Sequence, residues 1–372
     1  MIILHAAPVT WRHPNGVTHA VQNLATAQND VPGCRAGLWI TSRDVGTLPP
    51  LNFPVFTPGD SAGIRAPDRL PDTFRRPDLV VFHSTFVPLH ATAAAHLREL
   101  GVPYLLCPHG GMAAEALRQK SWKKRLGRLW FFDRLVRGAA AIQYLSHGEW
   151  ENSGDWGRPV IIAGNGVHPP TDDAIATPGR RSGRRFLFLG RLHIAHKGLD
   201  ILLEACRKVK EPLLRRGVEV VIVGPDVGGS RRRIEERIRE LDLGALVHVR
   251  DAAVGDEKRA WFQSADLFLH PSRTEGHPTA VLEAMSFGLP VLVTPGTNVA
   301  DEVVTEGAGW ETSCDPSELA RDLRILAELP GTALARAGFA ARNWVLRELT
   351  WNRVAARTVN KYQRVLQLAR AA

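Results

Sequence analysis

Cysteine is scarce in this sequence of 372 residues: only Cys34, Cys107, Cys206 and Cys314 occur, and they are widely scattered. No two of them form a C-x-x-C pair, which argues against a disulfide framework or a zinc site and favours a reducing cytoplasm. The sequence has no run of about 18 apolar residues, so no transmembrane helix is predicted. Residues 1–8 lack the basic segment of a signal peptide and their apolar run is too short for one, so we interpret them as a first strand.

Three motifs of nucleotide-binding proteins and hydrolases are also missing. There is no G-x-G-x-x-G after the first strand, no G-x-x-x-x-G-K-[ST] and no G-x-S-x-G. Those absences argue against a dehydrogenase, a nucleoside triphosphatase and a hydrolase. Asp172 and Asp173 lie in a polar segment that is a poor metal site, and His193 and His196 fit polar loop positions better than metal-ligand positions. We therefore predict no metal site.

The composition is that of an ordinary soluble globular protein, with 44% hydrophobic and 23% charged residues. The length fits two domains of about 170–190 residues each. The formal net charge of +9 suggests an acidic partner, which could be a nucleic acid, an anionic membrane or a phosphorylated substrate.

Short apolar strands and amphipathic helices alternate along the chain, and the pattern restarts after a polar segment at residues 171–185. Regular alternation predicts an α/β fold with a parallel sheet and helices on both faces, and here it occurs twice. We place the first domain at residues 1–170 and the second at residues 171–350. Residues 351–372 read as a terminal amphipathic helix.

Residues 270–290 give the strongest indication of a binding site. An apolar run at residues 265–269 predicts a buried strand, and a polar turn then leads into a helix that starts at Pro278. In open parallel sheets, ligands bind at the carboxyl ends of the strands. The free amides of Thr279 and Ala280 at the start of the helix would point toward an anion.

Charged side chains frame this helix start. Glu275 lies in the turn before it and Glu283 lies inside the helix, a layout that suits a phosphorylated ligand with hydroxyls at both ends, such as a nucleotide sugar. Arg191 and Lys197 follow another strand in a glycine-bounded loop, where two cations suit a diphosphate. They would stabilise a departing diphosphate more in the transition state, where its negative charge grows, than in the ground state.

Two positions in the first half of the chain follow predicted strands. Gly16 stands at the turn after the first strand, where it is either a plain turn glycine or a residue that lets a ligand approach the backbone. His109 follows the strand at residues 103–107, at the strand end where this fold class keeps its chemistry.

Residues 115–137 are strongly basic, with eight Lys or Arg residues against two acidic ones. Apolar side chains recur at 3–4 spacing opposite the basic ones, which predicts an amphipathic helix with Phe131 and Leu135 on or beside its basic side. The segment is either a surface helix packed on the core or, through residues 118–137, a peripheral contact with an anionic membrane that carries a lipid-linked acceptor. No nucleic-acid module accompanies it, so we predict no nucleic-acid partner. The apolar positions are Trp122, Leu126, Leu129, Phe132 and Val136.

Five short motifs, in the same order along the chain, resemble those of glycosyltransferase family 4, the retaining transferases of the GT-B architecture. The strongest match is an E-x7-E motif from Glu275 to Glu283, followed by Gly288-Leu289-Pro290. Each of the others is weak alone, but the ordered set is specific and spans nearly the whole chain. They are the turn at Gly16, Pro108-His109-Gly110, Asn165-Gly166-Val167, and Gly190-Arg191 with Lys197-Gly198.

The resemblance implies both a fold and a site. The fold is two Rossmann-like domains facing across a cleft, the first binding the acceptor and the second the nucleotide-sugar donor, with the terminal helix at about residues 351–372 completing the first. Glu275 should bind hydroxyls of the donor sugar, and Glu283 those of the nucleotide ribose. Arg191 and Lys197 should hold the diphosphate.

The resemblance also implies how the reaction runs. His109 should approach the donor sugar or stabilise the reacting centre, and the backbone after Glu275 should touch sugar and phosphate. Retention in this family is assigned to front-face attack assisted by the leaving phosphate, with no metal and no cofactor besides the nucleotide-diphosphate sugar as co-substrate. The donor-binding positions of this backbone are Gly276, His277, Thr279 and Ala280.

The sequence departs from the family pattern at two places. Asn15-Gly16 stands where many relatives have two glycines, and His277-Pro278 replaces the commoner Phe-Gly. Proline removes a backbone donor, so one expected contact is lost or replaced. His277 is either a sugar-pocket residue or a residue that only shapes the start of the helix.

The expected activity is that of a retaining hexosyltransferase that moves a hexosyl unit from a nucleotide-diphosphate sugar to a hydroxyl of a glycan or lipid-linked acceptor. Such a reaction would serve the synthesis of cell-surface polysaccharide, lipopolysaccharide or glycolipid, in the cytoplasm and peripherally at the inner face of the membrane. Two alternatives are open. One is a nucleotide-sugar epimerase of the same architecture, and the other is a non-catalytic relative that only binds sugar nucleotides.

Overall fold

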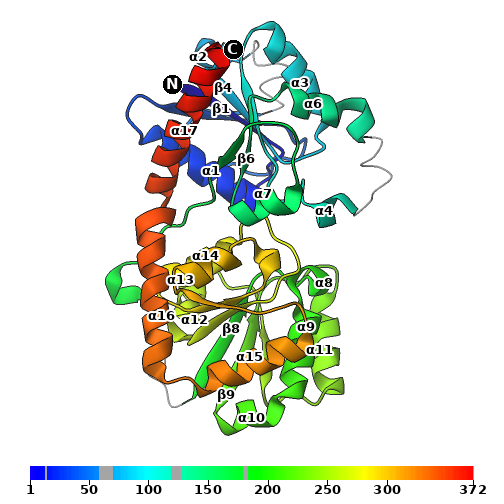
Figure 1. Ribbon diagram of the computed structural model, residues 1–372, viewed down its shortest axis with the longest axis vertical. Helices are drawn as coiled ribbons and strands as arrows, with labels where there is room; N and C mark the ends of the chain where they lie inside the picture. Colours follow the sequence, from blue (N-terminus) through cyan, green and yellow to red (C-terminus); the bar gives the residue numbers. More distant parts are fainter. Residues whose placement is uncertain (13–14, 58–69, 119–126, 179–182, 372) are drawn as a thin grey trace. The chain divides into compact units, whose positions relative to one another are not determined.

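The structure is a computed structural model that describes residues 1–12, 15–57, 70–118, 127–178 and 183–371 (Figure 1). The chain forms two compact units. The first comprises Met1–Gly166 and Trp351–Ala372, and the second comprises Val167–Thr350. The last helix therefore belongs to the first unit, and the second unit begins slightly before the expected boundary at residue 171.

The first unit is built on a sheet of seven parallel strands. They are β1 (Ile2–Ala7), β2 (Arg35–Ile40), β3 (Val55–Phe56), β4 (Leu79–His83), β5 (Tyr104–Cys107), β6 (Ala141–Tyr144) and β7 (Val160–Ile162). The spatial order β3-β2-β1-β4-β5-β6-β7 changes direction between β1 and β4. In doubly wound sheets the ligand site lies at such a switch point, beyond the carboxyl ends of the strands.

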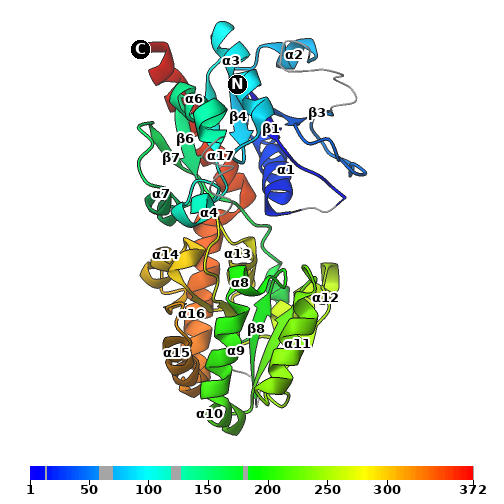
Figure 2. The same cartoon turned by 90° about the vertical axis from the view of Figure 1, so that its right-hand side faces the viewer.

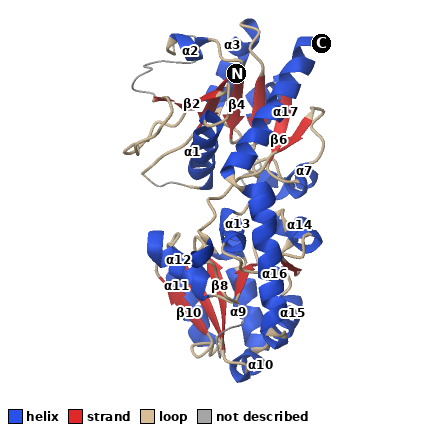
Figure 3. Ribbon diagram, turned by 90° about the vertical axis from the view of Figure 1, so that its left-hand side faces the viewer, coloured by secondary structure: helices blue, strands red, loops and turns tan. Residues whose placement is uncertain are grey.

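Helices cover both faces of this sheet, as Figure 3 shows with strands in red and helices in blue. Successive side chains of β1 point to opposite faces, so Leu4 and Ala6 join one apolar cluster while Ile3 and Ala7 join another. The first face is covered by α2 (Asp72–Arg75), α3 (Pro88–Glu99) and α6 (Asp133–Gly138), and the second by α1 (Gly16–Asn29) and α17 (Trp351–Ala371).

The last helix, α17, runs beside α1 although the two are far apart in the sequence (Figure 1). Trp351, Val354 and Ala355 pack with α1 side chains in a small apolar cluster. Further along the helix, the buried Tyr362 hydroxyl donates to Gln143 Oε1 of β6 at 2.5 Å. These contacts complete the second face of the first sheet.

The second unit repeats the plan with six parallel strands. They are β8 (Arg184–Leu189), β9 (Val218–Val223), β10 (Val247–Arg250), β11 (Leu267–His270), β12 (Val291–Val293) and β13 (Gly309–Glu311). The spatial order β10-β9-β8-β11-β12-β13 places the switch point between β8 and β11. The predicted pair of doubly wound parallel sheets is confirmed.

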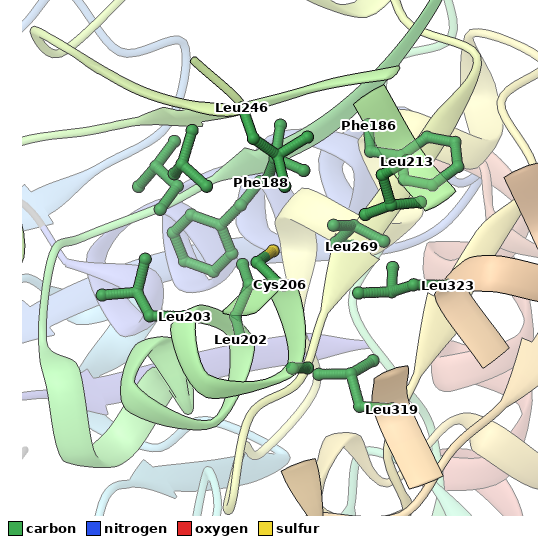
Figure 4. Close-up of a cluster of buried hydrophobic side chains, with 14 of the residues drawn as sticks. Phe186, Phe188, Leu202, Leu203, Cys206, Leu213, Leu246, Leu269, Leu319 and Leu323 are labelled. Atoms are coloured by element: carbon green, nitrogen blue, oxygen red, sulfur yellow. The ribbon is translucent and has the colours of Figure 1, made fainter. Parts of the chain in front are cut away.

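Apolar clusters fill both faces of the second sheet. Phe186 and Phe188 of β8 point into one cluster, shown in Figure 4, where Phe188 lies near Cys206. Leu187 points into the opposite one. The first cluster is covered by α9 (Leu199–Lys208), α10 (Lys210–Arg215), α11 (Ser230–Glu240) and α15 (Pro316–Glu328), and the second by α12 (Gly255–Ser264), α13 (Thr279–Ser286), α14 (Ala300–Thr305) and α16 (Gly331–Trp344).

The basic segment is helical where the structure describes it, but it is not one α-helix. It begins with α4 (Ala114–Arg118), and after the described residues resume, a π-helical turn at Arg128–Phe132 leads into α6. The expected apolar positions Trp122 and Leu126 lie in the part of the segment outside the described residues.

The expectation that Phe131 and Leu135 lie on or beside the basic side is wrong. Leu135 is 2% exposed, and Phe131 packs partly buried against the same core. A π-turn holds more residues than an α-turn, so the residues beyond it are rotated relative to the α-helical pattern used for the prediction. Trp130 points outward instead and is 81% exposed.

The polar segment at residues 171–185 is packed on the second unit where it is described. Ala176 N donates to Phe287 O at 2.7 Å. The buried guanidinium of Arg342 donates to Pro170 O at 3.1 Å and to Asp172 Oδ1 at 2.6 Å. The polar composition placed the domain boundary here, and in the structure a buried arginine holds the start of the segment on the second unit.

Removing the Tyr362 hydroxyl is expected to destabilise the first unit. Tyr362→Phe leaves Gln143 Oε1 buried without its donor, which costs about 1–2 kcal/mol. Urea unfolding followed by tryptophan fluorescence measures the loss. Leu368→Ala, on the same helix but 69% exposed, serves as the control and should leave the transition in place. An unchanged transition in Tyr362→Phe would contradict the expectation.

Candidate functional site

The switch point of the second unit carries a buried ion pair. Lys197 ends a short helix, α8 (Ile194–Lys197), in the loop after β8, and Glu275 lies in the turn after β11. Lys197 Nζ donates to Glu275 Oε1, and the two side chains are 10% and 12% exposed. Figure 2 shows α8 and α13 at the same end of β8. The structure thus brings together two residues that the sequence placed separately at strand ends.

Gly198 makes this approach sterically possible. Its φ is +64°, and a Cβ at this position would lie 2.0 Å from Pro271 O in the turn after β11. Any other residue would therefore push the Lys197 loop away from the Glu275 turn.

Glu275 receives two further hydrogen bonds at the same oxygen. His270 Nε2 lies 3.0 Å from Oε1, and Ser272 Oγ donates to it at 2.9 Å. Burial by itself raises the pKa of this carboxyl, but the His270 hydrogen bond and the Lys197 charge outweigh burial and hold the pKa well below its ordinary value. Glu275 is therefore an ionised carboxylate, and its Oε2 has no hydrogen-bond partner among the described residues.

Two aromatic rings lie nearly parallel to the imidazole of His270. Its ring lies 5.8 Å from Phe188 and 5.9 Å from Phe268, at interplanar angles of 11° and 14°. Burial lowers its pKa, so the imidazole is neutral and donates through Nε2. No role was predicted for His270 or Ser272 from the sequence. Their position at the end of a predicted strand was the one signal that could have identified them.

Asn298 fixes the backbone after Glu275. Its Nδ2 donates to Glu275 O and, at 3.5 Å, to Gly276 O, and its own φ is +61°. Asn298 follows β12 rather than β11, so neither periodicity nor spacing pointed to it.

The helix that follows this turn begins one residue later than expected. Pro278 is the residue before α13, and Thr279 is the first helical residue. No side chain caps the helix, and its first bonds run from Val281 N and Leu282 N to Pro278 O at 2.9 and 3.3 Å. The amides of Thr279 and Ala280 therefore have no partner among the described residues. Unpaired amides at a helix start are donors of the kind that bind anions in other proteins.

The other predicted donor-site residues differ in their surroundings. Glu283 of α13 is paired with Lys258 of α12, at 2.8 Å to Oε1 and 2.6 Å to Oε2. Arg191 is exposed. Burial lowers the pKa of His196, and the positive charges of Lys197 and Arg191 lower it further, so both cations lie near His196. Arg191 and Lys197 therefore lie near one another in the loop after β8. Glu283 is ion-paired with Lys258, a partner that was not predicted from the sequence.

His277 lies in the turn before α13. Burial lowers its pKa to about 4, so its imidazole is neutral at physiological pH. Its place beside Pro278, at the start of the helix, fits both of the roles considered from sequence.

In the first unit, His109 stands directly after β5 with a φ of +50°, and the adjacent Gly110 has a φ of +80°. Glu149, buried in α7 (His147–Ser153), holds this turn because its carboxylate accepts from Gly110 N and, at 2.6 Å, from Leu145 N. Burial raises the pKa of Glu149 to about 7, against the lowering effect of those two hydrogen bonds. Glu149 was not predicted as a site residue, because its hydrogen-bond partners are backbone amides, which no sequence motif identifies.

His109 is also hydrogen-bonded through its ring. Its Nε2 lies 2.8 Å from His83 Nδ1 and 3.5 Å from Cys107 Sγ. These three atoms are a set that could hold a soft metal ion. The 2.8 Å between the ring nitrogens is a hydrogen-bond distance, however, and is shorter than the roughly 3.3 Å that two nitrogen ligands of a tetrahedral zinc ion keep. In this arrangement the three side chains form a hydrogen-bonded cluster.

Gly16 is the first residue of α1. It is exposed, and a Cβ built there would meet nothing within 4 Å, so packing within the unit does not require glycine. The preceding Asn15 caps the helix by accepting from Val17 N and Thr18 N at 3.0 and 3.1 Å. Two of the amides that a ligand could use at this helix start are therefore already bonded.

Comparison with known proteins follows the same division of the chain. The family model of glycosyl transferases group 1 matches residues 183–328, and that of the glycosyl transferase 4-like domain matches residues 15–165. These regions lie in the second and the first unit respectively.

The chain is 32% identical over 146 residues to the putative colanic acid biosynthesis glycosyltransferase WcaL of Escherichia coli K12, a match that covers 37% of this chain and 35% of WcaL. It is 28% identical over 332 residues to the GDP-mannose:cellobiosyl-diphosphopolyprenol alpha-mannosyltransferase of Xanthomonas oryzae pv. oryzae, covering 83% of this chain and 81% of that protein. Anabaena Alr3699/HepE, solved in complex with UDP and glucose, superposes with a TM-score of 0.71 at 17% identity, covering 98% of this chain and 99% of that one.

The two doubly wound sheets and the structural similarity define the class as the GT-B fold. The chain belongs to the group 1 glycosyltransferases, glycosyltransferase family 4, as its ordered motifs suggested. No described helix combines the length and the apolar character needed to cross a bilayer.

Acid is expected to destabilise the protein between about pH 6.5 and pH 4. Burial lowers the pKa of His5, His109 and His277 to about 4 and that of His90 to about 3. Such a group binds fewer protons folded than unfolded, so the free energy of unfolding rises with pH across this window and falls on acidification. Glu149, with its raised pKa, contributes stability that is lost as pH rises from 4.5 to about 7, but it is one group against four.

Thermal unfolding at about pH 7 and about pH 5 measures this dependence. His90→Phe removes one of the four imidazoles and should make the dependence shallower. A midpoint that increases on acidification would mean that the Glu149 effect dominates instead.

Proposed function

We propose that this protein is a retaining hexosyltransferase that transfers a hexosyl unit from a nucleotide-diphosphate sugar to a hydroxyl of a glycan or lipid-linked acceptor in the synthesis of cell-surface polysaccharide, lipopolysaccharide or glycolipid. The observation that carries the proposal is the Glu275 carboxylate. It is ionised and mostly buried at the switch point of the second sheet, and one of its oxygens has no partner among the described residues.

Glu275 suits recognition of a sugar. Three donors converge on Oε1, so Oε2 is held in a fixed direction and can accept hydrogen bonds from hydroxyls of the donor. A buried polar site of this kind discriminates strongly, because a ligand without the matching hydroxyl leaves the carboxylate oxygen desolvated and unpaired.

The adjacent groups suit a diphosphate. The open amides of Thr279 and Ala280 and the exposed guanidinium of Arg191 supply hydrogen-bond donors and positive charge. Lys197 is ion-paired with Glu275 and adds a second positive charge for the diphosphate. Stabilisation of the departing diphosphate by these groups removes the need for a metal ion, and front-face attack assisted by that phosphate accounts for retention.

We assign Glu283 to the nucleotide ribose, with the Lys258 ion pair holding its carboxylate in place. We assign His109 a catalytic role, and Gly16 lets a substrate approach the start of α1. The name of the relative from Xanthomonas oryzae gives GDP-mannose as its donor, whereas the similar structure of HepE holds UDP and glucose.

The acceptor is assigned to the first unit and, in part, to a membrane surface. The name of the relative from Xanthomonas oryzae gives a cellobiosyl-diphosphopolyprenol, a lipid-linked sugar, as its acceptor. Trp130 is 81% exposed, and Arg134 and Arg137, a few residues further along the chain, are exposed as well. An exposed indole with nearby cations suits peripheral contact with an anionic membrane.

The donor site is tested by substitution. Glu275→Gln keeps the volume but removes the charge, so transfer should fall by about tenfold or more while nucleotide binding is largely kept. Lys197→Ala should weaken both, because it removes a cation and the partner of Glu275. Radiolabelled transfer and calorimetric nucleotide titration measure the two effects, after a thermal-shift screen against UDP, GDP, ADP and their sugars identifies the donor.

Lys210→Ala is the matched control, since Lys210 is an ion-paired lysine of the same unit, bonded to Asp242 in another region. Equal transfer by wild type, Glu275→Gln and Lys197→Ala would refute the site assignment. Donor isomerisation without any acceptor would refute transfer and favour an epimerase.

Membrane contact is tested by sedimentation with anionic liposomes. Binding should weaken as salt rises, because salt screens the attraction of the cations to anionic lipid. It should also drop in Trp130→Ala combined with Arg134→Glu, because this variant loses both the exposed indole that would insert into the bilayer and one of the cations. Phe339→Ala, at an aromatic residue of the second unit that is 68% exposed, is the control and should bind as wild type does. Absence of binding at low salt would end the membrane assignment.

A further inference from the structure

Four side chains of the first unit form one continuous hydrogen-bonded series that ends at His109. Gln28 Oε1 of α1 lies 2.7 Å from His5 Nε2 of β1. His5 Nδ1 lies 2.8 Å from His83 Nε2 of β4, and His83 Nδ1 lies 2.8 Å from His109 Nε2. Gln28 and His5 are fully buried, and His83 is 1% exposed. The series thus begins in the core between a helix and a strand and ends at the partly exposed residue after β5.

The three imidazoles are neutral. Burial lowers the pKa of His5 and of His109 to about 4. The pKa of His83 lies well below its ordinary value, first because of burial and second because a proton on His83 would be repelled by a proton on a neighbouring histidine. A neutral imidazole has one N–H and one lone pair. In a series of neutral rings, each hydrogen bond contains one N–H donor and one acceptor nitrogen or oxygen. Because each ring donates at one nitrogen and accepts at the other, all the N–H groups point in the same direction along the series.

The direction is given by Gln28. With Oε1 facing His5, the amide oxygen accepts from His5 Nε2–H, His5 Nδ1 accepts from His83 Nε2–H, and His83 Nδ1 accepts from His109 Nε2–H. Nδ1 of His109 is then left with its lone pair. It has no partner among the described residues, and His109 is only partly buried.

Packing alone does not account for the series. Each buried polar group costs desolvation that an apolar side chain of similar size would avoid. His90 of α3 is a buried histidine of the same unit that does not belong to the series. Its ring lies 4.8 Å from the Phe82 ring at an angle of 31°, and its Nε2 lies 3.1 Å from Thr41 Oγ1. The first unit can therefore bury a histidine that belongs to no such series. His5 and His83, in contrast, are hydrogen-bonded one after the other to a single ring nitrogen of His109.

We infer that His5, His83 and Gln28 are positioning residues that hold His109 in the tautomer whose Nδ1 accepts a hydrogen bond from a substrate hydroxyl. The inference rests on the proposed function for the substrate, while the tautomer itself is a property of the protein alone. Fixing an imidazole tautomer through its second nitrogen is an established way of making one ring nitrogen a constant acceptor. The His109 turn is held independently by the Glu149 contact to Gly110, so the series acts on the ring rather than on the backbone.

The test compares His83→Phe with His90→Phe. Both replace a buried imidazole of the first unit by an aromatic ring, so both should lower stability, but only His83→Phe interrupts the series. In protein labelled with ¹⁵N-histidine, the His109 ring of wild type should show protonated Nε2 and bare Nδ1. His83→Phe should give a mixture of tautomers, and kcat for transfer should fall about tenfold or more with KM for the donor little changed.

Gln28→Met provides a second variant, remote from His109, in case His83→Phe does not fold. It should also mix the tautomers, with a smaller loss of kcat. An unchanged His109 spectrum in the folded variants would overturn the series as the determinant of the tautomer. A changed spectrum with wild-type kcat would overturn its role in transfer. Failure of the proposed function is distinguishable, because wild type itself would then transfer no sugar while its His109 spectrum still reported the tautomer.

Discussion

The second unit depends on one buried negative charge. A carboxylate enclosed at the end of a sheet is unfavourable unless donors surround it. Lys197, His270 and Ser272 meet this requirement at a single oxygen of Glu275, and the rest of the local structure serves their approach. The strand order sets β8 beside β11, and Gly198 allows the two turns that follow them to touch. The site is therefore a consequence of the switch point and of one glycine.

The two units use polar burial in different ways. In the second, an ion pair and a neutral histidine fix the direction of a carboxylate that is available to a ligand. In the first, His83 and His5 form a neutral series behind His109, and Glu149 holds the backbone of the same turn. Both arrangements hold a polar side chain in a fixed direction through buried hydrogen-bond partners. Preorganisation of this kind lowers the reorganisation needed when charge develops during a reaction.

Much of the fold was predictable from the sequence, because strands buried on both faces read as continuous apolar runs and helices as 3–4 patterns. The strand-end positions of Lys197, Glu275 and His109 followed from the same alternation. A partner that comes from another strand was not predictable: Asn298 follows β12 and reaches the Glu275 turn only after β11 and β12 are paired. The burial of Leu135 was also missed, because the 3–4 pattern assumes a regular α-helix throughout.

The π-helical turn at Arg128–Phe132 makes the length of this segment as important as its composition. One residue turns an α-helix by about 100°. Loss of a single residue here would restore a regular helix and would swing Leu135 and Val136 out of the core, while side chains now facing solvent would rotate inward. Single-residue deletions in this turn should therefore be far rarer among functional descendants of this chain than substitutions at its exposed positions.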